Sequence, residues 1–166
     1  MARKISVIAM FSAFAILAAY VESFIPSIGI PGVKLGLANI AVVLALYILD
    51  AESAIIVDVV RIVIVGLLFG SMMSMSFALA GAFVSLTVMI ILKKCFDFSI
   101  ITVSIFGGFF HNVGQMIIAW ILVDNYNILY YMPVLLIAGI VTGTIIGLLA
   151  KVLYTRTGVI CKKILK

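Results

Sequence analysis

The chain has 166 residues, of which 66% are hydrophobic and 10% are charged. A soluble domain carries about 25% charged residues, so this composition excludes an ordinary water-soluble protein and indicates an integral membrane protein. We attribute the formal net charge of +5 to basic residues that flank membrane helices. The lipid bilayer is therefore an expected partner, and nucleic acid is not.

Apolar runs separated by short polar turns predict an all-α bundle of six transmembrane helices, which forms a single domain over residues 1–166. The predicted helices cover about 5–25, 35–49, 53–70, 74–92, 99–122 and 129–150. From Lys151 onward we expect a polar tail. Nine of the eleven Lys and Arg residues fall on one side if the N-terminus is inside, so both termini are predicted to be cytoplasmic.

The fifth predicted helix has no charged residue between Ser99 and Val123, yet its middle holds His111, Asn112 and Gln115. His111 and Gln115 are four residues apart and share a helix face, with Asn112 on its flank. Polar side chains at this depth usually face the bundle interior or a wet cavity. They either join helices by hydrogen bonds or line a ligand pocket, and we favour the pocket because glycines beside them make room.

Charged residues also occur within or next to the apolar segments. In the third helix Asp58 and Arg61 are one turn apart, so they can form an ion pair, and the Arg61 guanidinium could hold a carboxylate or a phosphate. The turn-rich first loop brings Glu22, Lys34 and Asn39 to the outer side. We take Lys34 and Asn39 as candidate substrate ligands, with snorkelling at the interface as the alternative for Glu22 and Lys34.

Small residues recur four apart on two helices, which lets another helix approach closely. The last helix carries Gly139, Gly143 and Gly147, which we predict to be helix-packing residues. The first helix carries Ala9 and Ala13, a candidate docking face for a partner.

The sequence has no GxxxxGK[ST] loop for ATP and no aspartate-rich cluster that would hold magnesium and a diphosphate. We therefore expect no catalytic residue, no metal site and no cofactor.

Several segments resemble the Gx transporter family, also known as heptaprenyl diphosphate synthase component I. They are VKLGLANIAVVLALYIL (33–49), the arginine and glycine of RIVIVGLLFGS (61–71), FALAGAFVSLTVMIILKK (77–94), SIFGGFFHNVGQ (104–115) and YYMPVLLIAGIVTG (130–143). The chain is similar more broadly, mainly in architecture, to the substrate-binding S components of energy-coupling factor transporters.

The resemblance implies a multi-pass protein of the prokaryotic plasma membrane that captures a small molecule from outside. Ala9 and Ala13 would dock on a transmembrane coupling protein, and two ATPase subunits on other chains would drive release. An anionic isoprenoid or quinone precursor is the substrate class that the family name and Arg61 suggest. Two alternatives stay open: a non-catalytic accessory subunit of heptaprenyl diphosphate synthase, and a quinone- or flavin-linked electron-transfer subunit.

Overall fold

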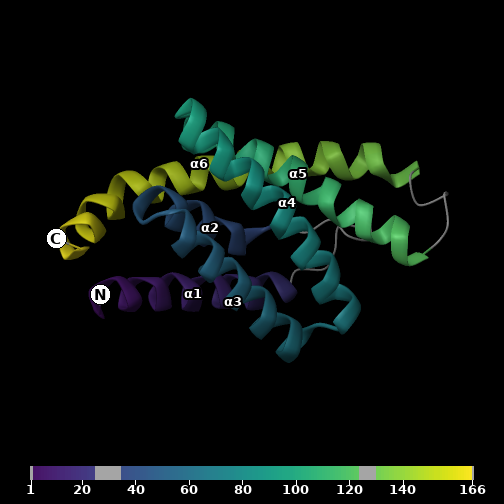
Figure 1. Cartoon of the computed structure of the whole chain (residues 1–166), viewed down its shortest axis with the longest axis horizontal. Helices are drawn as coiled ribbons and strands as arrows, with labels where there is room; N and C mark the ends of the chain where they lie inside the picture. Colours follow the sequence, from purple (N-terminus) through teal and green to yellow (C-terminus); the bar gives the residue numbers. More distant parts are fainter. Residues whose placement is uncertain (1, 25–34, 124–129, 166) are drawn as a thin grey trace.

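The computed structural model of the chain describes residues 2–24, 35–123 and 130–165. Its elements are six helices, and no strand occurs in these ranges. In chain order they are α1 (Ala2–Ser23), α2 (Leu37–Ile48), α3 (Ala51–Phe69), α4 (Met72–Phe96), α5 (Ile100–Val123) and α6 (Met132–Leu165) (Figure 1). The predicted all-α membrane fold is confirmed.

Four of the helices, α1, α4, α5 and α6, are long and apolar enough to cross a membrane. The other two depart from the prediction of six full spans. With 12 residues, α2 is about 18 Å long, well short of the ~30 Å hydrocarbon core. The interior of α3 carries the charges of Asp58 and Arg61, which a lipid-facing span would avoid.

Helix α2 is short because other helices, rather than lipid, surround it. Nine of its 12 residues are buried, and it packs against α1, α3 and α6. A helix that is apolar on every side belongs in a core. The continuous apolar run of α2 therefore marks the centre of the bundle rather than a membrane-exposed span.

The last helix is longer than predicted. Instead of ending near residue 150 before a polar tail, α6 continues to Leu165. Proline is absent from this stretch, and several of its residues pack against the core: Cys161 is buried there, and the ring of Tyr154 lies 6.3 Å from the ring of Tyr47. Packing of this kind stabilises the helical conformation of a segment that the sequence alone suggests is a polar tail.

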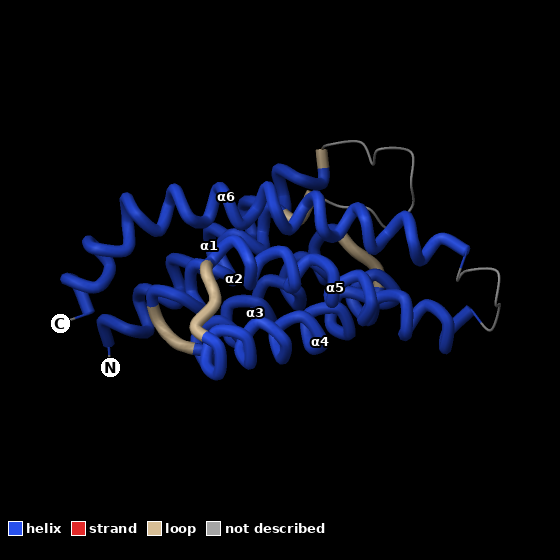
Figure 2. Tube along the Cα trace, turned by 90° about the horizontal axis from the view of Figure 1, so that it is seen from above, coloured by secondary structure: helices blue, strands red, loops and turns tan. Residues whose placement is uncertain are grey.

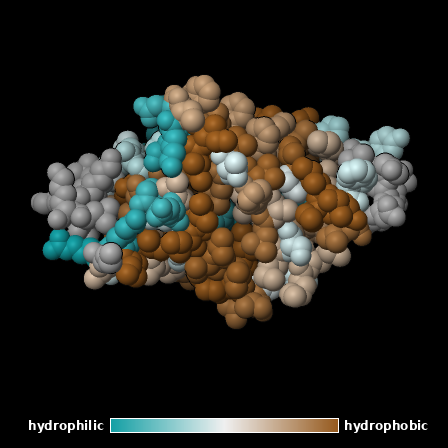
Figure 3. Space-filling view, in the orientation of Figure 1, coloured by the Kyte–Doolittle hydropathy of each residue, from teal (hydrophilic) through white to brown (hydrophobic). Residues whose placement is uncertain are grey.

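The two termini lie at the same end of the bundle (Figures 1 and 2), α1 and α6 run along its long axis, and α3 and α4 cross it obliquely (Figure 1). On the face seen in Figure 3 a broad apolar surface covers the middle of the molecule, and hydrophilic residues gather toward the end with the termini. There Lys4 of α1 and Asp50 before α3 form an ion pair of 2.6 Å. The Lys4 ammonium holds the pKa of Asp50 down at about 2.

Glycines allow α4, α5 and α6 to lie almost in backbone contact. A Cβ atom on Gly139 of α6 would lie 2.6 Å from the Gly108 carbonyl oxygen of α5, and one on Gly143 would lie 2.7 Å from the Ser104 carbonyl oxygen. On the opposite side of α5, a Cβ on Gly114 would lie 2.6 Å from the Ala80 carbonyl oxygen of α4. Side chains cannot fit at these crossings, which explains why α5 is packed tightly on both sides.

Gly139, Gly143 and Gly147 thus all lie on the α6 face that contacts α5. A Cβ on Gly147 would lie 2.9 Å from the Cα of Ile101. The spacing of four residues places each glycine one turn after the last along that face.

Candidate functional site

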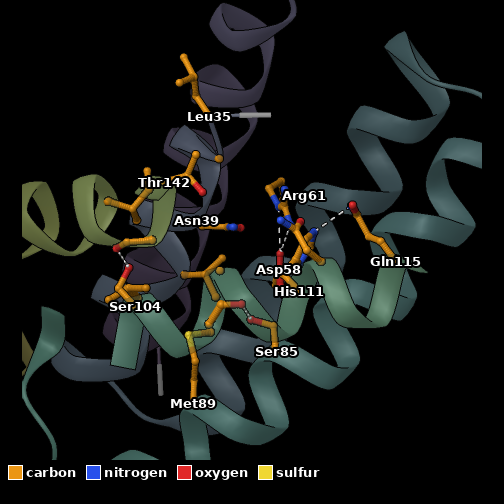
Figure 4. Close-up of a pocket in the computed structure, with 18 of the residues that line it drawn as sticks. Leu35, Asn39, Asp58, Arg61, Ser85, Met89, Ser104, His111, Gln115 and Thr142 are labelled. Atoms are coloured by element: carbon orange, nitrogen blue, oxygen red, sulfur yellow. Dashed lines mark hydrogen bonds and ion pairs between the residues drawn. The ribbon is translucent and has the colours of Figure 1, made fainter. Parts of the chain in front are cut away.

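A cavity of about 90 Å³ lies inside the bundle, with residues from all six helices in its wall. It extends from the C-terminal end of α1 and the start of α2 to the middle of α5, and Figure 4 shows many of the side chains around it. Buried Val42 and Val43 of α2 line it as well, together with Met89 and Ile146. The cavity has room for several water molecules or for a small polar molecule.

The structure brings five of the six candidate substrate ligands to this cavity: Asn39, Arg61, His111, Asn112 and Gln115. The sixth, Lys34, lies outside the described residues. Because α2, α3 and α5 contribute these side chains, only the packing of the helices brings them together. Their role in binding remains a prediction.

Ala9 and Ala13 lie elsewhere, on the outer surface of α1. Both are exposed, whereas Val7, Phe11 and Ala15 of the same helix are buried. Ala9 and Ala13 therefore face away from the bundle, on the side of α1 that does not pack against the other helices.

Asp58 and Arg61 form the predicted ion pair within α3. The Arg61 Nε donates to Asp58 Oδ1 at 2.9 Å, and Nη2 of the same guanidinium also binds this oxygen. The Asp58 side chain is 4% exposed and that of Arg61 is 14% exposed. The pair is thus largely withdrawn from solvent but borders the cavity.

His111 and Gln115 interact on one face of α5, with the Gln115 side-chain nitrogen 3.1 Å from His111 Nε2. Asn112 has a different role. Its amide nitrogen donates to the Leu135 carbonyl oxygen of α6 at 2.5 Å, so this side chain joins two helices while its residue lines the cavity. Asn112 therefore fulfils both roles expected from the sequence: its amide nitrogen bonds α5 to α6, and other atoms of the residue line the cavity.

Three hydroxyl residues in the wall were not singled out from the sequence. Ser85 donates to the Gly107 carbonyl oxygen at 2.9 Å, and Ser104 donates to that of Gly143 at 2.8 Å. Thr142 donates to the carbonyl oxygen of Ala138 in its own helix at 2.9 Å. Ser104 lies two helical turns before His111, so the two residues share a face of α5, and this spacing could have identified Ser104 from the sequence.

Glu22 fixes the start of α2 at the rim of the cavity. One carboxylate oxygen accepts the N–H of Gly36 at 2.6 Å, and the other accepts that of Leu37 at 3.1 Å. Gly36 is left-handed, with φ 75°, and this conformation suits glycine. Glu22 therefore binds the positive end of the α2 dipole, which is more than the interfacial snorkelling considered from the sequence.

We predict that Glu22→Gln lowers the free energy of unfolding by about 1–3 kcal/mol. Gln keeps one acceptor oxygen but turns an amide NH₂ toward the second backbone N–H, and it loses the charge that opposes the dipole. Thermal unfolding in detergent would measure the change. Glu52→Gln is the matched control because Glu52 is exposed in the first turn of α3; an equal loss in both variants would contradict the capping role.

Within the described ranges, no group of three or more His, Cys, Asp or Glu residues is arranged to hold a metal ion. The cavity wall instead combines one guanidinium, two carboxylates, amides and hydroxyl groups. This set can bind a small molecule by hydrogen bonds and charge.

Comparison with curated proteins found no match, and comparison with solved structures found none either. A family model does match, over residues 11–153, and this range includes every described residue of the cavity wall. The chain belongs to the family described as heptaprenyl diphosphate synthase component I.

Proposed function

We propose that the protein is a substrate-binding membrane subunit that captures a small polar molecule for uptake, with the coupling protein and two ATPases on other chains. The observation that carries the proposal is the polar cavity at the centre of an otherwise apolar bundle. Burying so many polar groups is costly unless they serve a purpose. A bundle that needed only stability would fill this space with apolar side chains.

The position of the cavity suits capture from one side of the membrane. Its wall includes Glu22, Leu35 and Gly36 at the end of α1 that points away from the termini, while Val43, Met89 and Ile146 line it further in. With the termini in the cytoplasm, as the distribution of Lys and Arg predicts, the polar end would be the external one.

The exposed face of α1 suits a membrane partner. Ala9 and Ala13 offer small side chains on the outside of the bundle, where a second helix could approach closely. We propose this face as the docking site for the transmembrane coupling protein.

Substitution at the docking face tests the proposal. Ala9→Leu and Ala13→Leu add bulk to an exposed surface, so folded yield should be retained, whereas uptake of the substrate by cells and co-purification of the coupling protein should fall at least about tenfold. Thr87→Leu, exposed on α4, is the control for added bulk away from this face. Normal uptake in both alanine variants would refute docking at this face.

The family name favours a second candidate, a non-catalytic membrane subunit of heptaprenyl diphosphate synthase. In that role the protein would hold a partner enzyme or its lipid product at the membrane. Native mass spectrometry of the detergent-purified protein separates the two functions. A co-purified small polar molecule supports capture, whereas a polyprenyl lipid or a synthase subunit supports the accessory role.

A further inference from the structure

The cavity offers two places where an anion would be expected to bind. One is the guanidinium of Arg61, and the other is the N-terminal end of α2, where backbone N–H groups and the helix dipole favour negative charge. Each place is already occupied by a carboxylate of the protein. Asp58 takes Nε and Nη2 of Arg61, and Glu22 takes the N–H groups of Gly36 and Leu37.

Among the described residues of the wall, the charged side chains are the carboxylates of Glu22 and Asp58 and the guanidinium of Arg61, which sum to a formal charge of −1 when His111 is counted as neutral. The dipole of α2 offsets about half a charge at Glu22. An anion that takes the Nε–Nη2 edge of Arg61, or the N-terminal end of α2, would have to displace an internal carboxylate, and that carboxylate would then lack a partner.

The hydrogen-bonding groups of the wall likewise suit a ligand that donates hydrogen bonds better than an anion, which accepts them. The hydroxyl hydrogens of Ser85, Ser104 and Thr142 all point to backbone carbonyl oxygens, so these side chains can offer only oxygen lone pairs to a ligand. Asn112 donates one of its two amide N–H groups to the Leu135 carbonyl oxygen, and its side-chain carbonyl oxygen is available as an acceptor. Both bonds to Asp58 fall on Oδ1, and no described residue donates to its Oδ2.

Asn39 completes the wall opposite the ion pair. Its side chain extends toward Arg61 and Asp58 (Figure 4), and it makes no hydrogen bond to another described residue. An amide can donate and accept, so Asn39 can adapt to either kind of ligand. The remaining wall is rich in acceptors, and two of the five N–H groups of its main donor, Arg61, already bind Asp58.

We propose that the cavity binds a small cationic molecule rich in hydrogen-bond donors, such as a protonated amine, rather than an anion. The ammonium group would lie against Asp58 Oδ2, and the hydroxyl oxygens and side-chain carbonyl oxygens would accept its other donors. The inference rests on the proposed capture function and replaces the anionic substrate class suggested by the family resemblance and by Arg61.

Ligand-observed NMR on the detergent-solubilised full chain tests the inference. The probes are amino alcohols and diamines of two to six carbons, hydroxy acids of matched length, and inorganic diphosphate. We expect saturable binding of at least one amine and at least about tenfold weaker binding of every anion. An anion that binds the unaltered protein as tightly as the amines would overturn the inference, and this outcome needs no variant.

Asp58→Asn provides the second measurement. It should weaken amine binding by about tenfold to a hundredfold, because it removes a charged hydrogen bond, and it should let the released Arg61 bind an anion. Asp50→Asn is the matched control, since Asp50 lies outside the cavity and Asn also caps a helix well. Amine binding that survives Asp58→Asn unchanged would contradict the inference.

The outcomes also separate the inference from the proposed function. Anion binding that is lost in Asn39→Ala would place an anionic ligand in this cavity, so capture would stand and the cationic class would be wrong. If no probe binds and no small molecule co-purifies, both fail.

Discussion

Arg61→Ala is expected to destabilise the protein by about 3–5 kcal/mol, because it leaves the Asp58 carboxylate without its partner. The Asp58 side chain is 4% exposed, and its two side-chain hydrogen bonds both come from Arg61. Water in the cavity can reach only the side of the pair that borders it. Denaturant or thermal unfolding in detergent, followed by helical circular dichroism, would measure the loss.

The double variant Arg61→Ala with Asp58→Asn shows whether the uncompensated charge is the cause. Removing both charges should recover a large part of the stability, since an amide in the cavity wall is far less costly than a lone carboxylate. If the double variant is less stable than Arg61→Ala alone, the loss comes from the packing of the Arg61 stem and the ion-pair explanation is wrong. Glu52→Gln again serves as a charge control on the same helix.

Sequence alone anticipated contacts within single helices better than it anticipated how the helices pack. Helical spacing brought His111 and Gln115 to one face, and the separation of three residues paired Asp58 with Arg61; both contacts are present. These interactions lie within single helices, so local geometry determines them. Asn39 became a candidate as a polar group of the predicted first outer loop, and the structure places it within α2, in the same wall.

What sequence could not supply depends on contacts between helices. The apolar run of α2 looks the same whether lipid or protein surrounds it, so its place in the core appears only in the packing. Glu22 binds Gly36 and Leu37, fourteen and fifteen residues away, across a turn-rich loop. The donors of Ser85 and Ser104 are directed to neighbouring helices, so the acceptor bias of the cavity cannot be read from residue types.

Gly139→Ala is expected to lower the stability of the bundle by about 1–3 kcal/mol, even though Ala is the better helix former by about 1 kcal/mol. The added Cβ would lie 2.6 Å from the Gly108 carbonyl oxygen and 2.8 Å from the Asn112 amide nitrogen. Relief would require α5 and α6 to separate, which would also strain the bond from Asn112 to Leu135. Folded yield and unfolding temperature in detergent would report the change.

The same substitution at Gly158 is the control, because the nearest described atoms to a Cβ there belong to the Tyr154 ring, at 3.4 Å, an ordinary van der Waals contact. Gly158→Ala lies on the same helix and should be neutral or stabilising, as helix propensity alone dictates. The test is whether the stability of the protein falls in Gly139→Ala but is unchanged or rises in Gly158→Ala. If Gly139→Ala also stabilises the protein, α5 and α6 have room to spare, and the close α5–α6 contact that forms part of the cavity wall does not depend on glycine.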